Sequence, residues 1–212
     1  MTPGPVDPAR HTFRSPKFAS VVQEAVQFLS STPVHPFTSL PSFPGVGVYA
    51  LYYFGSFDLY DYLTALNQKE HVQPIYVGKA VPRGWRKART SFSEVNRELF
   101  GRLVEHAHSI EDANNLEIED FCCRFMILSD VESDLIAAVE AALIRQYRPL
   151  WNTVVDGFGN HDPGSGRYNQ ARSEWDILHP GRPWAENLTG TSPTRQSVVA
   201  KIQQVKSRLP LP

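Results

Sequence analysis

Cysteine is scarce in this chain of 212 residues, and its scarcity argues against two classes of protein. The two cysteines, Cys122 and Cys123, are adjacent, so the chain has neither a Cys-x-x-Cys zinc spacing nor the paired cysteines of a disulfide-rich secreted domain. Neighbouring residues of a strand point to opposite faces. We therefore expect two small core side chains in a reducing cytoplasm.

Long hydrophobic runs are also missing. The longest, Val46 to Phe54, is far too short to cross a bilayer. Met1 to Arg14 is polar and proline-rich, so we expect no signal peptide. With 42% hydrophobic and 20% charged residues, the composition indicates an ordinary globular protein, long enough for one domain with extensions.

A strong charge of one sign is absent as well, since the net charge is −1. The charges are nevertheless unevenly placed. Lys79 to Leu103 holds seven Lys or Arg and two Glu, a balance of +5, and Val104 to Asp120 holds six Asp or Glu without Lys or Arg, a balance of −6. The basic segment could contact phosphate, and the simpler alternative is two solvated faces that partly pair.

Hydrophobic periodicity predicts an α+β fold. A core of strand, strand, helix, strand and helix indicates a small three-stranded sheet with helices against it. The predicted strands are Val46–Phe54, Pro74–Gly78 and Phe121–Leu128, and the predicted helices are Phe18–Leu29, a short Leu59–Leu66, Glu94–Ile110, Ser133–Tyr147 and a terminal one around Val198–Val205. We expect a flexible tail over residues 1–14, a helix and connector over 15–44, a core over 45–155 and an extension over 156–212.

One charged residue falls inside an apolar helical stripe. Glu140 follows Ile136 by four residues and precedes Leu143 by three, in the predicted helix Ser133–Tyr147. A carboxylate on such a face is costly unless it is paired. The sequence therefore predicts either a cationic side chain or a metal ion beside Glu140, and leaves the choice open.

Other polar residues are ambiguous when taken singly. Arg102 and His106 lie one helical turn apart, and a surface ladder is their simplest interpretation. Tyr49 and Tyr76 lie in predicted strands, where tyrosine is usually a core aromatic with its hydroxyl toward water. Asn152 follows the helix of Glu140, where a cap is the ordinary explanation.

As a set, these residues resemble the GIY-YIG nuclease family. Five elements occur in the order of that family over residues 45–152: Gly47-Val48-Tyr49, Tyr76-Val77-Gly78-Lys79, Arg102 with His106, Glu140 in its apolar helix, and the closing Pro149-x-x-Asn152. Each tripeptide has valine in place of isoleucine. The resemblance implies a three-stranded antiparallel sheet flanked by helices.

The flanking segments narrow the resemblance to one branch. Phe28 to Pro36, Pro41 to Tyr49 and Trp175 to Arg182 look like the type II restriction endonucleases of this superfamily, and members similar to this chain cut the palindrome CCGCGG. One departure from compact members is the longer gap between the two tripeptides. Its polar and aromatic residues, Asp58, Tyr60, Asp61 and Tyr62, have contacts that the sequence leaves open.

The resemblance implies hydrolysis of phosphodiester bonds in double-stranded DNA with one magnesium ion per active site, for which manganese could substitute. Glu140 would bind the metal, because a hard carboxylate oxygen suits magnesium. Arg102 would hold the scissile phosphate with its fork of N–H donors. Tyr49 would act as the general base that activates water.

Four further residues would assist this chemistry. Lys79 would lower the pKa of the Tyr49 phenol, and His106 would accept the proton of Tyr49 or hold its hydroxyl in position. Tyr76 would bond a phosphate oxygen or the attacking water, and Asn152 would orient its neighbours. The division of labour between Tyr49 and His106 stays open.

Recognition of a GC-rich site would favour arginine, whose guanidinium matches the N7 and O6 of guanine. The candidates are Arg83, Arg86 and Arg89 after the second tripeptide, and Arg167, Arg172, Arg182 and Arg195 in the extension. Cutting both strands of a palindrome requires two active sites, hence a homodimer at least on DNA. The resemblance also implies a bacterial cytoplasm and a cognate DNA methyltransferase in the same cell.

Three alternatives remain. A GIY-YIG repair or homing nuclease would need additional DNA-binding modules, for which the residues after Asn152 leave little room. A DNA-binding protein that no longer cuts would be expected to have lost Tyr49, Arg102 or Glu140. A nucleotide-binding enzyme would need a Gly-x-x-x-x-Gly-Lys-Ser/Thr loop, which the chain does not contain.

Overall fold

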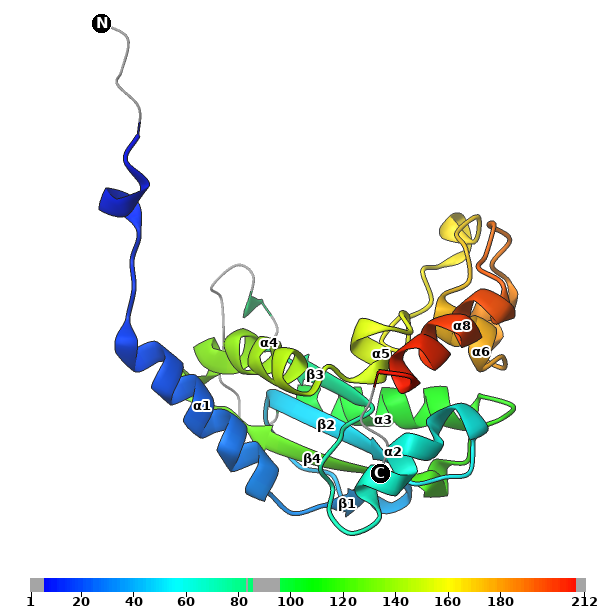
Figure 1. Cartoon of the computed structure of the whole chain (residues 1–212), viewed down its shortest axis with the longest axis horizontal. Helices are drawn as coiled ribbons and strands as arrows, with labels where there is room; N and C mark the ends of the chain where they lie inside the picture. The colour runs from blue at the N-terminus through cyan, green and yellow to red at the C-terminus, as the bar shows by residue number, and fades with distance from the viewer. Residues whose placement is uncertain (1–5, 83, 86–95, 209–212) are drawn as a thin grey trace, which may run out of the picture.

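A four-stranded antiparallel sheet forms the centre of the computed structural model, which describes residues 6–82, 84–85 and 96–208. Its strand order is β1-β4-β2-β3 (Figure 1). The strands are β1 (His35–Pro36), β2 (Gly47–Tyr53), β3 (Tyr76–Ala80) and β4 (Phe121–Ile127). The prediction of three strands was therefore one strand short.

The missed strand is β1, which lies in the proline-rich connector. It has two residues, and they pair with Cys123 and Cys122 of β4. Proline has no N–H for a ladder, so it is tolerated at the edge of a sheet but not in its middle. A two-residue edge strand that contains proline has no alternation or β-branched run from which it could be predicted.

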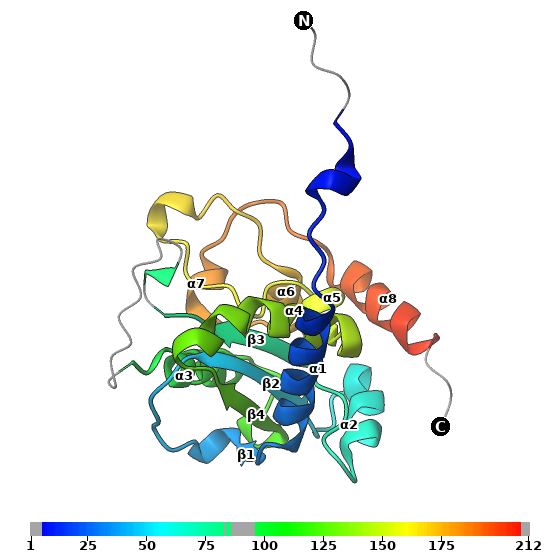
Figure 2. The same cartoon turned by 90° about the vertical axis from the view of Figure 1, so that its left-hand side faces the viewer.

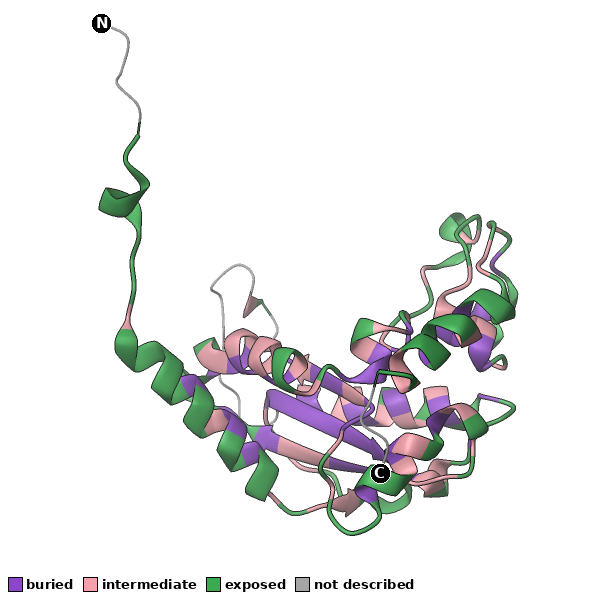
Figure 3. Ribbon diagram, viewed as in Figure 1, coloured by how far each residue is buried: buried purple, intermediate pink, exposed green. Residues whose placement is uncertain are grey.

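Strand β2 is the buried centre of the sheet. All seven of its residues are buried (Figure 3), and it pairs with both β3 and β4. Because side chains alternate along a strand, Tyr49 and Leu51 enter one core cluster, while Val48 and Ala50 enter the other. The sheet therefore has a packed core on each face.

Helices α1 (Pro16–Ser31) and α4 (Ile136–Tyr147) cover the Val48 face, and α3 (Glu98–Glu111) covers the Tyr49 face. The shorter helices are α2 (Asp61–Asn67), α5 (Leu150–Thr153), α6 (Glu174–Leu178), α7 (Pro183–Glu186) and α8 (Arg195–Lys206). Short 3-10 helices span Pro8–His11, Phe37–Ser39, Asp58–Tyr60, Ile118–Asp120, Asp130–Leu135 and Ser165–Arg167. Ahead of α1, residues 6–15 run away from the body of the molecule in both views (Figures 1 and 2).

The helix of Glu140 differs from its prediction at the start only. Its first turns are the 3-10 helix Asp130–Leu135, and the α-helix begins at Ile136. It ends where Arg148 adopts a left-handed conformation (φ 45°) immediately before Pro149, as expected from the proline. The predicted start of α3 at Glu94 lies outside the described residues.

The segment after α5 packs on the Tyr49 face of the sheet. Phe158, Trp175, Val198 and Ile202 all join the core cluster that contains Tyr49. The C-terminal segment therefore contributes side chains to the same hydrophobic core as β2. Among the described helices, none combines the length and apolar character that crossing a membrane requires.

The insertion between the two tripeptides, residues 55–72, anchors this C-terminal segment. Tyr60 is fully buried, and its Oη lies 2.6 Å from His179 Nε2 and accepts from Trp151 Nε1 at 2.9 Å. Asp61, at the start of α2, pairs with Lys206 of α8 at 2.5 Å. The insertion thus contacts α5, the segment after α6, and α8.

Candidate active site

Tyrosines, cations and carboxylates from both tripeptides and from two helices line one cavity of about 360 Å³. Its lining residues are Tyr49, Tyr76, Lys79, Ala80, Val81, Glu98, Arg102 and Glu140. Strands β2 and β3 and helices α3 and α4 each contribute at least one of them. Five of the seven residues predicted for catalysis are therefore brought to one place.

Tyr49 and His106 form a buried pair next to this cavity. The Tyr49 Oη lies 2.6 Å from His106 Nε2, and both side chains are almost fully buried. Burial raises the pKa of Tyr49 well above its usual value and lowers the pKa of His106 to about 3. Both groups are consequently neutral near pH 7, and the phenol donates to the imidazole.

The position of the Tyr49 hydroxyl explains why the second tripeptide ends in glycine, at Gly78. It pairs with Tyr49 across β2 and β3. A Cβ at position 78 would lie 2.4 Å from the Tyr49 Oη, a distance that excludes any side chain. The glycine therefore makes room for the Tyr49 hydroxyl against the backbone of β3.

The side-chain amide of Asn152 forms hydrogen bonds with the backbone of β3. The Val77 N–H donates to Asn152 Oδ1 at 2.8 Å, and Asn152 Nδ2 donates to the Val77 carbonyl at 2.8 Å. These two bonds satisfy the outward backbone groups of an edge strand. They fix the residue between Tyr76 and Gly78. The Asn152 side chain does not line the cavity, and its orienting role stays a prediction.

The charge of Glu140 is offset by Lys79. Lys79 Nζ donates to Glu140 Oε2, and the Glu140 side chain keeps 18% of its surface exposed. Of the two partners that the sequence left open, the structure contains the cationic side chain. Lys79 and Glu140 both line the cavity of the two tyrosines, so the ion pair belongs to the same site.

The residues present fit a hydrated divalent cation better than a metal cage. Within the described residues, no group of three or more His, Cys, Asp or Glu side chains is arranged to hold a metal ion. The cavity contains the carboxylate of Glu140, the residue predicted to bind the metal. Magnesium commonly takes one or two protein carboxylates and completes its shell with waters and substrate phosphate, which matches this donor set.

Arg102 enters the cavity from α3. Its Nη1 donates to Glu105 Oε2 at 2.8 Å and also contacts His161 Nε2. His161 comes from a glycine-rich loop of the C-terminal segment, residues 156–167, which holds Gly157, Gly159, Gly164 and Gly166. It was not predicted to belong to the site.

A second residue of this loop also reaches the site. The ring of Phe158 stacks on His106 with centroids 4.5 Å apart and an angle of 16°, and it meets Tyr76 edge-on at 4.9 Å. Next to it, a Cβ at Gly159 would lie 2.8 Å from the Tyr76 Oη. The glycines of this loop were visible in the sequence, and close approach to Tyr76 explains one of them.

The structure gives Arg182 a structural role in place of the predicted DNA contact. Its side chain is 1% exposed and pairs with the equally buried Asp176 at 2.6 Å. Its remaining N–H groups donate to backbone carbonyls, so no edge is left for a base. Burial of an unpaired charge is costly, and Arg182 and Asp176 neutralise each other.

The other predicted arginines have different surroundings. Arg167 and Arg195 are exposed, and Arg172 bonds to the carboxylate and the backbone of Glu186, each at 3.2 Å. Arg83, Arg86 and Arg89 lie outside the described residues.

An antiparallel sheet with helices on both faces, and a cavity that joins two tyrosine tripeptides to an arginine and a glutamate, together define a GIY-YIG nuclease. The family model of the Eco29kI GIY-YIG domain matches residues 41–206. The chain belongs to this family, which is a family of restriction endonucleases. None of the curated proteins compared with the chain matches it.

Proposed function

We propose that the protein is a type II restriction endonuclease that hydrolyses double-stranded DNA at a GC-rich palindrome, CCGCGG, with magnesium as its metal. The observation that supports this most is the convergence of Tyr49, Arg102 and Glu140 on one cavity within the region matched by the family. GIY-YIG nucleases generally use divalent metals, and the donor set of the cavity suits magnesium.

Arg102 binds the scissile phosphate in this mechanism. Both of its contacts among the described residues use Nη1, so Nη2 and Nε remain to bond two phosphate oxygens. Such a bidentate pair strengthens as negative charge develops on the phosphorane. Glu140 would hold the metal ion, which when bound would relieve the charge on the departing 3′ oxygen.

Tyr49 receives a proton from the attacking water while it passes its own proton to His106 Nε2. The hydrogen bond of 2.6 Å between the two groups provides the path. In the free protein, burial disfavours both charged forms, because it raises the pKa of Tyr49 and lowers that of His106. A phosphate anion in the cavity would stabilise the imidazolium and so favour the transfer.

Tyr76 and Lys79 act on the phosphate from β3. The pKa of Tyr76 is raised to about 12, mainly by burial, so its hydroxyl stays protonated and can donate to a phosphate oxygen. Lys79, which pairs with Glu140 and lines the same cavity, would add a positive charge beside the phosphate. Asn152 keeps Tyr76 in place by holding the backbone of Val77.

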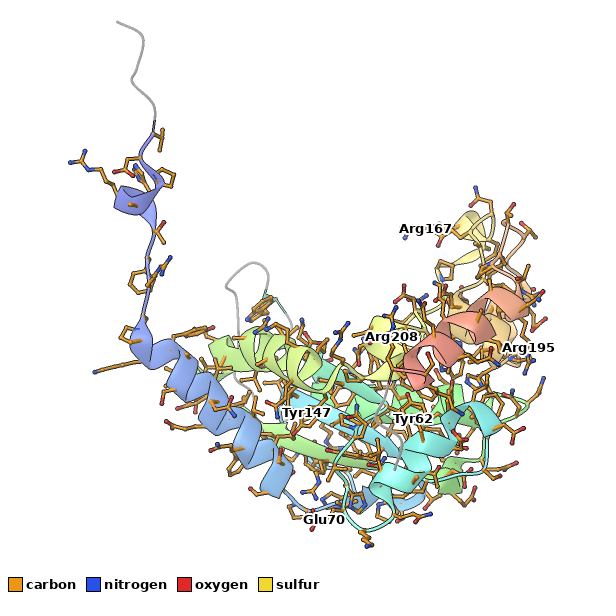
Figure 4. The ribbon with its side chains drawn as sticks, viewed as in Figure 1. Tyr62, Glu70, Tyr147, Arg167, Arg195 and Arg208 are labelled. Carbon is orange, nitrogen blue, oxygen red and sulfur yellow. The ribbon has the colours of Figure 1, made fainter. Side chains whose placement is uncertain are left out.

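We assign recognition of the DNA bases to the C-terminal segment. Arg167 lies at its far end from the sheet (Figure 4) and lines a second cavity of about 350 Å³ together with Asn160 and Gln170. Guanidinium and amide groups are the side chains that read purine edges in the major groove. Arg172 and Arg195 are further DNA contacts. A palindrome cut on both strands requires a homodimer at least on DNA, in a bacterial cytoplasm that also holds a protecting methyltransferase.

Digestion of plasmid DNA with and without magnesium tests the proposal. Discrete fragments that end at CCGCGG are expected with magnesium, and none without it. Discrete fragments with other ends would indicate a GIY-YIG nuclease of different specificity. Intact DNA under every divalent metal, together with tight duplex binding, would replace the proposed activity with that of a DNA-binding protein.

A further inference from the structure

A contact between His161 and Arg102 links the C-terminal segment to the residues proposed for catalysis. The two residues are 59 positions apart, and His161 Nε2 meets Arg102 Nη1. A guanidinium can only donate, so Nε2 must accept. The contact therefore uses the tautomer of His161 that carries its proton on Nδ1.

The backbone that leads to His161 is held by hydrogen bonds from the buried side chain of Arg182. The Arg182 guanidinium donates to the carbonyls of Gly157 at 3.0 Å, Phe158 at 3.1 Å and Asn160 at 3.3 Å. It also lies 4.5 Å from the centroid of the Trp175 ring. Three bonds from one buried side chain hold the residues immediately before His161, although His161 itself is exposed.

The same loop also packs against the Tyr49–His106 pair. Phe158 stacks on His106, which bonds to Tyr49. The position of His161 is thus tied to the Tyr49–His106 pair on one side and to a buried ion pair on the other. A histidine on such a loop is presented at a defined place even though its ring is open to solvent.

Two acceptors hold one nitrogen of Arg102. Nη1 donates to Glu105 Oε2 at 2.8 Å and to His161 Nε2, and these two acceptors are 3.9 Å apart. Glu105 is only three positions away on the same helix, so it restrains the side chain from one side alone. His161 supplies the restraint from outside the helix.

We propose that His161 is a positioning residue for Arg102, which extends the proposed nuclease function and rests on it. By holding Nη1, His161 sets the plane of the guanidinium so that Nη2 and Nε face the scissile phosphate. An arginine side chain otherwise has considerable rotamer freedom. The C-terminal extension would then complete the catalytic site of the GIY-YIG core rather than contacting DNA alone.

A double-mutant cycle on the single-turnover cleavage rate tests this role. His161→Leu removes the acceptor and should lower the rate by about 10–100-fold, as expected when a catalytic group is misplaced. His161→Gln places an amide oxygen near the position of Nε2 and should recover most of the loss. In an Arg102→Ala background, His161→Leu should change the rate by less than about twofold, because the two residues act through one interaction.

His108→Leu is the matched control. His108 is exposed on the same helix as Arg102, bonds to Glu111 at 3.1 Å and lines neither cavity, so its loss should leave the rate unchanged. Nitrogen NMR of labelled histidine provides a readout without DNA: His161 Nε2 should be an unprotonated acceptor, and its resonance should shift in Arg102→Ala.

Equal losses from His161→Leu in both backgrounds, or a His161→Gln variant no better than His161→Leu, would overturn the positioning role alone. An Nε2 resonance that does not respond to Arg102→Ala would also overturn it. A wild-type protein that cuts no duplex would instead contradict the proposed nuclease function, and the inference would fail with it.

Discussion

Tyr49 is held by contacts that leave its hydroxyl a single orientation. His106 accepts from it, Gly78 leaves the space that it occupies, and the ring lies in the core on the α3 face of β2. Because the hydroxyl is positioned by packing rather than by solvent, a small displacement of β3 would move it away from the water that we propose it activates. At the scale of single residues, the site depends on close packing around this tyrosine.

Gly78→Ala tests this dependence. A Cβ 2.4 Å from the Tyr49 Oη must displace either the ring or β3, so we expect the single-turnover cleavage rate to fall by about 100-fold or more. Gly101→Ala on α3 is the control, because its Cβ meets nothing within 4 Å. That substitution should retain the rate and raise the free energy of unfolding by about 0.5–1 kcal/mol. Wild-type cleavage by Gly78→Ala would show that the Tyr49 hydroxyl can move without consequence.

The residues that line the cavity were predictable as candidates because each is linked to a local pattern. Tyr49 and Tyr76 belong to glycine-containing strands, and Glu140 interrupts an apolar helical stripe. Phe158 and His161 have no such signal, since their roles depend on packing between segments far apart in sequence. Arg182 was misassigned for the same reason: an arginine in a loop resembles a DNA contact until its buried partner Asp176 is known.

At the scale of elements, the strands and helices with strong periodicity were predicted correctly. Strands β2 and β4 and helix α3 agree with their predictions to within a few residues at the described ends. Strand β1 was missed because two residues in a proline-rich connector carry no periodicity. The α-helix of Glu140 begins later than predicted because its first turns are 3-10, which propensity does not distinguish from α.

Arg182→Met should show that the glycine-rich loop is held by one ion pair. The change leaves Asp176 buried without a partner and releases three backbone carbonyls, so we expect a loss of about 3–5 kcal/mol in the free energy of unfolding. Urea denaturation measures it. Arg195→Met, at an exposed position of α8, is the control and should change stability by less than about 0.5 kcal/mol. Equal stability of the two variants would mean that Arg182 does not anchor the loop.

At the scale of the whole molecule, two buried histidines couple folding to pH. Burial lowers the pKa of both His106 and His179 from 6.5 to about 3. His179 bonds to Tyr60 of the insertion and to Asn115, so the two histidines lie in different parts of the same core. Each is neutral when folded and takes up a proton on unfolding below pH 6.5.

Stability should therefore fall as the pH is lowered from about 6.5 toward 3 and should not depend on these groups above that range. Each histidine contributes a slope of up to about 1.4 kcal/mol per pH unit, because the unfolded chain binds more protons. Urea denaturation between pH 7 and pH 5 measures the slope, and His179→Gln should remove part of it. A free energy of unfolding that stays constant from pH 6.5 to pH 5 would contradict the neutral, buried state of both rings.

The overall architecture joins a nuclease core to an extension that shares its hydrophobic core. Phe158 and Trp175 pack in the cluster of Tyr49, and α2 and α8 are linked by Asp61 and Lys206. DNA contacts at the far end of the extension, such as those proposed for Arg167, would consequently be rigidly connected to the cavity of Arg102 and Glu140. This connection is what a site-specific nuclease needs to join recognition to cleavage.

Cleavage and binding by Glu140→Gln test the account most directly, on a duplex that contains CCGCGG. Glutamine keeps the size of the side chain but loses the charge that pairs with Lys79 and that would bind the metal. We expect magnesium-dependent cleavage to fall below detection while the affinity for the duplex, measured without metal, stays within about threefold of wild type. Cleavage by Glu140→Gln at the wild-type rate would remove this carboxylate, and the metal assigned to it, from the mechanism.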